Sequence, residues 1–239
     1  MLDGCLSRLG FADEIVVVLD RCTDRSAEIA HAHADQIIEG GWEIEGERRN
    51  LGIQACTGEW IVEIDADEWV DELLAQEIRA AIRSDEFDAY DIPVDNYIGK
   101  RLVRHGWGGG SFGAVVFPGL FRKGRKRWEN YRVHPHIVID GKLGRLKNGV
   151  AHYVDRDISD MLARLDRYTT AHGKDMAARG DTKRGLGTMF RKFTSRFWKI
   201  YFVRKAYKER ELGIMIALCG ALYPLISHIK AVEEESQRS

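Results

Sequence analysis

The sequence predicts an α/β protein with a mostly parallel sheet, followed by a helical C-terminal region. Residues 14–19 (Glu-Ile-Val-Val-Val-Leu) and 60–64 (Trp-Ile-Val-Glu-Ile) have the length and the lack of alternation of strands buried on both faces. Each run is followed by a segment with helical spacing of apolar residues, which is the strand–helix order of βαβ units. From about Ser159 the pattern is helical to the end.

Composition and charge exclude several classes of protein. With 44% hydrophobic and 10% aromatic residues, the 239-residue chain can bury a sizeable core, which excludes a disordered or fibrous protein. The 36 basic residues are balanced by 37 acidic ones, so we do not expect a polycation that coats nucleic acid. The four cysteines form no Cys-x-x-Cys pair, and residues 1–10 do not resemble a signal peptide. We therefore expect a reducing, cytoplasmic compartment.

The remaining elements follow from caps and apolar spacing. Thr23 or Asp24 can cap the first helix, and Gly58 ends the second. From Tyr90 onwards the chain changes to short strands and glycine-rich loops. We expect helices around residues 27–32, 50–57 and 74–82, and short strands at 114–117, 120–122 and 136–139.

The main chemical signal is Asp65-Ala66-Asp67-Glu68, directly after the second strand. Ligands of an open α/β sheet bind at the carboxyl ends of its strands. Two carboxylates two residues apart suit Mg²⁺ or Mn²⁺, which binds one or two carboxylates together with substrate phosphates. The alternative is a solvated turn followed by an acidic helix start. The tripeptide alone does not decide, because Asp-x-Asp is common by chance.

The longer string from Asn50 to Glu68 resembles family 2 glycosyltransferases of the GT-A fold, in which Asn-x-Gly, a small residue, Gly, an apolar strand and Asp-Ala-Asp-Glu follow in order. Residues 17–26 are similar to the strand, Asp and Ser/Thr-Asp turn of the same family. The branch that extends the bacterial lipopolysaccharide core is similar at Tyr131-Arg-Val-His134, Gly141-x-x-Gly144-x-Leu146, His152-Tyr153 and Tyr168-Thr-Thr170. The resemblance runs from about Leu2 to Lys230.

The resemblance implies roles for single residues. Asp20 matches a carboxylate that contacts the nucleotide base, and Arg49 a basic residue close to the sugar nucleotide. Asp65 matches a ribose or metal contact. Asp67 matches the direct metal ligand, and His152 a histidine that reaches the same metal from a later strand. The structural alternatives are a helix-capping turn residue for Asp20, a surface charge for Arg49 and a buried structural histidine for His152.

Two residues are candidates for the catalytic base. Family members often have Val-His-Glu where this chain has Val133-His134-Pro135. An inverting displacement gains from a carboxylate that accepts the proton of the acceptor hydroxyl, and Pro135 has none. Glu129 and His134 are the candidate catalytic residues, with structural roles as the alternative for each.

A second departure is at the N-terminus. The family begins with a strand and an Asn-Glu-type turn that cradle the nucleotide, and neither is present; residues 1–9 match the helix that follows them. A catalytically impaired nucleotide-sugar-binding module, or a fragment, is therefore an alternative to an active enzyme. A nucleotidyltransferase is a further alternative, but it requires a glycine-rich phosphate loop near the start that is not found here.

Two later segments are strongly basic. Residues 122–127 carry five positive charges, which suits either a diphosphate or anionic acceptor or a solvated hairpin tip. Residues 189–210 carry eight basic residues against one acid, with Phe190, Phe193, Phe197 and Ile200 at helical spacing. This pattern suits an anionic membrane surface or a helix packed on its own protein. Residues 212–229 lack charged residues but contain Pro224, which favours a buried or membrane-apposed hairpin.

We therefore expect a GT-A-like catalytic domain at 1–155, incomplete at its N-terminus, and a helical region at 156–239. The resemblance implies inverting, metal-dependent sugar transfer from a nucleotide-sugar donor to a glycan or lipid-linked acceptor in cell-envelope polysaccharide or lipopolysaccharide synthesis. The implied cofactor is Mg²⁺ or Mn²⁺, and no nucleic acid is expected as a partner. The expected location is cytoplasmic, peripheral at the inner face of the cytoplasmic membrane.

Overall fold

The computed structural model describes residues 1–106, 116–129, 136–182 and 185–238. The chain divides into two compact units. Unit 1 comprises Met1–Asp95 and Val116–His152, and unit 2 comprises Asn96–Val115 and Tyr153–Ser239. Each unit has its own hydrophobic core, and all four cysteines are free.

Unit 1 begins with two parallel strands and three helices. β1 (Val16–Asp20) pairs with β2 (Gln36–Gly40) in register, with Val16 opposite Gln36. Asp24 Oδ1 accepts the N–H of Ser26 over 3.0 Å, but Arg25 is the N-cap residue of α2 and no side chain caps this helix, so the expected cap by Thr23 or Asp24 does not form. The helices are α1 (Leu2–Leu6), α2 (Ser26–His33) and α3 (Glu45–Ala55).

The larger sheet has the strand order β3-β7-β5-β11-β4, with β10 also paired to β5. A separate pair is formed by β8 and β9. The strands are β3 (Trp60–Val62), β4 (Glu68–Trp69), β5 (Ala89–Ile98), β7 (Val116–Arg122), β8 (Lys126–Trp128), β9 (Ile137–Ile139), β10 (Leu143–Arg145) and β11 (Val150–Asp155).

The α/β class is confirmed, but the sheet is mixed rather than mostly parallel. β1–β2 and β5–β10 are parallel, whereas β3–β7, β5–β7, β4–β11 and β8–β9 are antiparallel. Parallel neighbours need a crossover of a dozen or more residues, usually a helix. In the described part of unit 1 no helix follows α4 (Glu72–Ala81), so the later strands add mainly as antiparallel neighbours.

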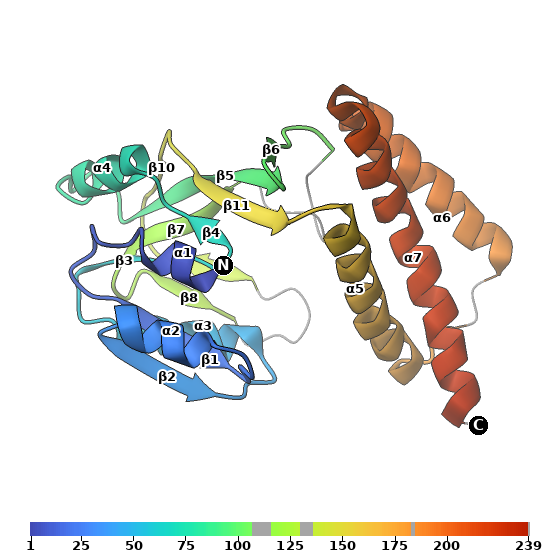
Figure 1. The fold of residues 1–239 in the computed structure, drawn as a ribbon, viewed down its shortest axis with the longest axis horizontal. Helices are drawn as coiled ribbons and strands as arrows, with labels where there is room; N and C mark the ends of the chain where they lie inside the picture. The colour runs from blue at the N-terminus through green and yellow to red at the C-terminus, as the bar shows by residue number, and fades with distance from the viewer. Residues whose placement is uncertain (107–115, 130–135, 183–184, 239) are drawn as a thin grey trace. The chain divides into compact units, whose positions relative to one another are not determined.

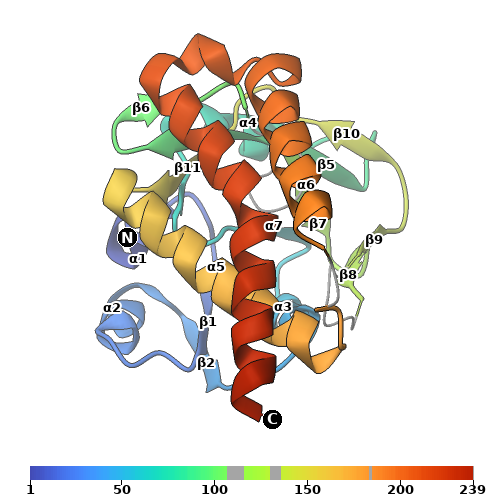
Figure 2. The same cartoon turned by 90° about the vertical axis from the view of Figure 1, so that its right-hand side faces the viewer.

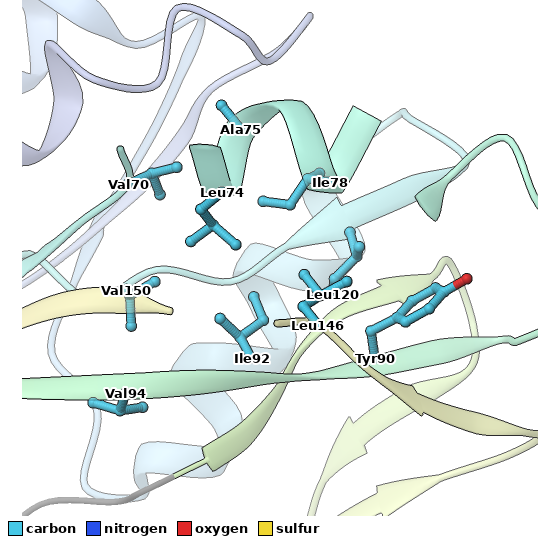
Figure 3. Close-up of a cluster of buried hydrophobic side chains, with 10 residues drawn as sticks. All are labelled: Val70, Leu74, Ala75, Ile78, Tyr90, Ile92, Val94, Leu120, Leu146 and Val150. Carbon is cyan, nitrogen blue, oxygen red and sulfur yellow. The ribbon is translucent and has the colours of Figure 1, made fainter. Parts of the chain in front are cut away.

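Helix α4 covers the larger sheet and provides the main core of unit 1. Asp71 caps it, because Oδ1 accepts the N–H of Leu74 over 2.8 Å. Leu74 and Ile78 point toward the side chains of Ile92 and Leu120 on the sheet (Figure 3). Leu74 and Ile92 have no exposed surface, so the expected helical spacing after the acidic cluster does bury one face.

A cavity of about 540 Å³ lies between the β1–β2 pair and β3 of the larger sheet in unit 1. Among the strands that the structure describes, β1 pairs only with β2 and β3 only with β7, and none precedes β1. Residues of α1, β1 and β3 line the cavity, together with Arg49 and Asp65. Arg49 and Asp65 are therefore accessible from this cavity.

Unit 2 is mainly helical. α5 (Ile158–Ala178) and α6 (Leu186–Trp198) both pack along the long helix α7 (Arg210–Arg238), which lies between them (Figures 1 and 2). The π-helical turn η1 (Lys199–Val203) and the 3₁₀ turn η2 (Ala206–Glu209) join α6 to α7, and β6 (Arg101–Leu102) pairs with the end of β5. The buried core is formed by Met161, Leu165, Ile200, Ile216 and Cys219, among others.

The expected hairpin at 212–229 is wrong, because this stretch lies inside the single helix α7. An internal proline costs about 3 kcal/mol in an isolated helix, and packing against α5 and α6 offsets that cost here. Within the described residues, one helix, Ala206–Gln237, is long and apolar enough to cross a membrane by length and composition alone. Of its most apolar window, 44% is buried within the structure.

Candidate active site

Asp20 ends β1, and two donors fix its carboxylate. The N–H of Trp42 donates to Oδ1 over 3.2 Å, and Arg48 Nη1 donates to Oδ2 over 3.2 Å. The side chain is 18% exposed. Since Asp24 makes the contact ahead of α2, Asp20 does not cap that helix. Its carboxylate therefore has a fixed orientation at the carboxyl end of β1.

Arg49 on α3 joins three carboxylates, one from its own helix and two from the segment that follows β3. Its Nη1 and Nη2 donate to the two oxygens of Asp65 over 2.9 and 3.1 Å, a bidentate geometry that is among the stronger ion pairs. Nη1 also donates to Glu63 over 2.6 Å and Nε to Glu45 over 2.9 Å, and the guanidinium lies 4.7 Å from the ring centroid of Trp128. Burial opposes its charge, but Asp65, Glu63 and Glu45 raise the pKa of Arg49 above its ordinary value. Arg49 is therefore the centre of an ion-pair network and not a surface charge.

Asp65 and Asp67 have different partners, although both lie in the turn between β3 and β4. The Asp65 carboxylate binds Arg49, whereas Asp67 Oδ2 lies 3.3 Å from His152 Nε2 on β11. The antiparallel pairing of β4 with β11 sets His152 opposite Glu68, which brings the imidazole to Asp67. Burial acts against both charges, but the contact lowers the pKa of Asp67 and raises the pKa of His152.

The Asp67–His152 pair can provide one carboxylate oxygen and one imidazole nitrogen to a divalent ion. In the part of the chain that the structure describes, no group of three or more His, Cys, Asp or Glu side chains is arranged to hold a metal. The third expected member, Asp65, has both oxygens engaged by Arg49. Mg²⁺ and Mn²⁺ bind through one or two protein ligands when substrate phosphates and water complete the shell. The two donors fit an ion whose coordination shell is completed by a bound diphosphate.

Glu68 was missed as a site residue. It is 6% exposed, and its Oε2 accepts the N–H of Asp65 over 3.0 Å. Burial and the nearby charge of Asp65 raise the pKa of Glu68 to about 7. Its sequence neighbours suggested an exposed acidic helix start, whereas the short strand β4 places Glu68 inside. Glu68 therefore fixes the backbone of the acidic turn from the protein interior, through its hydrogen bond with the N–H of Asp65.

A second group that sequence reasoning missed supports Arg49. Lys126 has no exposed side-chain surface, and its Nζ lies 2.7 Å from Glu63 Oε2. Trp128 Nε1 donates to the same carboxylate over 3.2 Å. Burial lowers the pKa of Lys126, and Lys126 and Arg49 together lower the pKa of Glu63 despite its burial. The only available signal was the alternation of Lys126 and Trp128 along a short strand.

The basic segment 122–127 is therefore neither a uniform anion site nor a uniformly solvated tip. Lys126 is internal, and Arg122 pairs with Glu59 and Asp85. Arg125 lies 3.4 Å from Asp140. Most of the positive charge of this hairpin is paired within unit 1.

Glu129 follows β8 and lies against α3. Its N–H donates to the carbonyl of His136 over 3.0 Å. Its own carbonyl oxygen is so close to Gly46 that a Cβ there would lie 2.5 Å away. This contact holds the backbone of Glu129 beside the first turn of the helix that carries Arg49. The other candidate base, His134, lies outside the described residues together with Pro135.

Comparisons with known proteins identify the family of this chain. The lipopolysaccharide core biosynthesis glycosyltransferase LpsC of Rhizobium meliloti (strain 1021) is 23% identical over 252 aligned positions, which cover 100% of this chain and 89% of LpsC. An uncharacterized glycosyltransferase of Rickettsia felis is 24% identical and covers 82% of this chain and 71% of its own. Among solved structures, S. aureus TarS 1–349 in complex with UDP is 13% identical with a TM-score of 0.48, covering 98% of this chain and 85% of that one. Residues 1–140 match the model of glycosyl transferase family 2, which is more than half of the chain, and the chain therefore belongs to this family.

Proposed function

We propose that this glycosyltransferase moves a hexose or heptose from a nucleotide sugar to a glycan or lipid-linked acceptor in the synthesis of cell-envelope lipopolysaccharide. The observation that carries the proposal is the position of Asp20, Arg49 and the Asp67–His152 pair after the ends of β1 and β3 and on the neighbouring α3 and β11. The name of the relative LpsC supports the acceptor class. We propose a cytoplasmic location, where nucleotide sugars are made.

The proposed donor site uses groups that are already oriented. The Asp20 carboxylate would accept a hydrogen bond from the nucleotide base, because Trp42 and Arg48 hold it in one orientation. The Asp65 carboxylate is half exposed and would contact the ribose. Arg49 fixes Asp65 and lies near the proposed position of the sugar nucleotide.

Asp67 and His152 would hold Mg²⁺ or Mn²⁺. When bound, such an ion supplies positive charge that neutralises a diphosphate leaving group. With the donor fixed, an acceptor hydroxyl attacks the anomeric carbon from the opposite side and inverts it. Glu129 would accept the proton of that hydroxyl, and its backbone contact with Gly46 supports a fixed position for the residue.

Calorimetry with UDP and Mn²⁺ tests the donor site. Wild-type protein should bind UDP about tenfold or more tightly with Mn²⁺ present, since coupled ligands typically change one another's affinity by this order. Asp67→Asn removes a charged ligand and should abolish the coupling. Asp140→Asn, which changes an exposed carboxylate paired with Arg125, is the matched control and should retain it. Unchanged coupling in Asp67→Asn would refute the metal assignment.

Turnover separates the rival bases and the impaired binding module. With a panel of nucleoside diphosphate hexoses and heptoses and a truncated lipopolysaccharide as acceptor, Glu129→Gln should lower turnover by about 10²–10⁴-fold while UDP affinity stays constant. Collapse in His134→Ala alone would transfer the role to the histidine. A wild-type chain that binds UDP and Mn²⁺ but transfers no sugar from any donor would identify a binding module.

A further inference from the structure

The segment from α6 to η2 presents an apolar strip outside the core of unit 2. Phe190 is 68% exposed, Trp198 60% and Phe202 44%. Their four-residue spacing, with Thr194 between the first two, puts these side chains on one face of the helix. The rings of Trp198 and Phe202 lie 4.2 Å apart between centroids. Val203 and Tyr207, 64% and 46% exposed, extend this aromatic strip.

Of the four apolar residues whose spacing suited a membrane surface in the sequence, only Phe190 belongs to this strip. Ile200 is buried and Phe197 is packed against the core that α7 contributes, and Phe193 is half-buried. Helix α6 is therefore apolar on two faces. Packing on its own protein explains the first face, whereas the aromatic strip stays largely exposed among the described residues of unit 2.

The charges around the aromatic strip have one sign. Arg191, Lys199 and Lys205 are exposed next to its members. The only acid among residues 189–210, Glu209, is buried. It accepts hydrogen bonds from the N–H groups of Arg104 and His105 over 3.0 and 3.1 Å, so its charge is used internally. The exposed surface of this segment is aromatic and cationic.

We propose that the aromatic strip docks on an anionic lipid bilayer. Tryptophan and tyrosine suit the boundary between headgroups and acyl chains, because one end of each ring system is apolar and the other polar. Lysine and arginine beside them attract anionic headgroups. A second copy of this chain is a poorer occupant, since a symmetric contact would bring the same cationic segment against itself. The proposal concerns unit 2 and does not depend on the sugar-transfer chemistry.

The test uses the full chain with vesicles of phosphatidylcholine alone or mixed with equal phosphatidylglycerol. Wild-type protein should co-sediment with the mixed vesicles, and about 0.5 M NaCl should weaken binding by screening. The triple variant Arg191→Glu, Lys199→Glu, Lys205→Glu should bind about 100-fold more weakly or worse, because each basic residue contributes about 1 kcal/mol. Trp198→Ser with Phe202→Ser should lose about tenfold through lost apolar burial.

The matched control is Arg167→Glu with Tyr168→Ser, an exposed basic–aromatic pair on α5. It should bind like wild type, and circular dichroism should show all variants folded. If the triple variant unfolds, binding of the double variant Trp198→Ser, Phe202→Ser decides whether the proposal stands. Equal wild-type binding to both vesicle types, or equal loss in the α5 control, overturns the proposal. A wild-type dimer that Trp198→Ser dissociates would assign the strip to a second copy instead.

Discussion

Replacement of Glu68 by glutamine should stabilise unit 1 at neutral and higher pH. Glu68 is buried beneath the acidic turn, where burial and Asp65 raise its pKa from 4.5 to about 7. Glutamine keeps an oxygen that can accept the N–H of Asp65 but carries no charge. The variant therefore removes the titration and retains the hydrogen bond.

The direction in which stability changes with pH follows from the state, folded or unfolded, that binds the proton more tightly. Because the folded-state pKa lies above the unfolded value, Glu68 contributes stability that is fully present below about pH 4.5 and is lost as the pH rises through about 7. The gap between 4.5 and about 7, at about 1.4 kcal/mol per pKa unit, corresponds to about 3 kcal/mol. The pKa of His152 is raised as well, so its titration also lowers stability as the pH rises. The difference between wild type and variant measures the titration of Glu68 together with its electrostatic coupling to His152.

Urea unfolding between about pH 4 and 9, with EDTA in all buffers and tryptophan fluorescence as the signal, measures this difference. Relative to Glu68→Gln, wild type should lose about 3 kcal/mol of unfolding free energy across this range. Glu72→Gln, an exposed substitution on α4, should run parallel to wild type. Parallel curves for Glu68→Gln and wild type would refute the assignment of a raised pKa to this residue.

Two further substitutions test the support of the site. Lys126→Met removes the buried partner of Glu63 and should cost about 3 kcal/mol of unfolding free energy, whereas its exposed neighbour Arg127→Met should change it by less than about 0.5 kcal/mol in the same urea measurement. Gly46→Ala places a Cβ 2.5 Å from the Glu129 carbonyl, so it should destabilise unit 1 by about 1–3 kcal/mol; Gly10→Ala, with nothing within 4 Å, should not. Equal effects within either pair would contradict the contacts described.

The strands and helices with the clearest periodicity could be predicted from the sequence. The apolar runs that became β1 and β3, and the spacing that became α4, depend mainly on neighbours in the chain. β5 was not predicted as one long strand, since Pro93 argues against a strand that lies within a sheet. The directions of the later strands depend on pairings between distant segments, which the local pattern does not contain.

Contacts between distant segments also limited how much of the site could be predicted. The resemblance suggested Asp67 and His152 together, and the structure brings them to 3.3 Å, although the metal itself stays a prediction. The Glu63–Lys126 contact could not be found in this way. A glutamate inside an apolar strand and a lysine inside a basic run each look like exceptions or surface charges when they are considered separately.

The charges around the acidic turn explain why a cation should accompany the donor. Near Asp67 the carboxylates of Asp65 and Glu63 already engage Arg49, so this guanidinium has little charge left for a diphosphate. Like charges repel one another, so UDP without a metal should bind weakly beside these carboxylates. Asp67→Asn removes one of these charges as well as a metal ligand. Metal-free UDP affinity should therefore rise in this variant while the Mn²⁺-dependent gain disappears, and a residue with only a structural role would lower both.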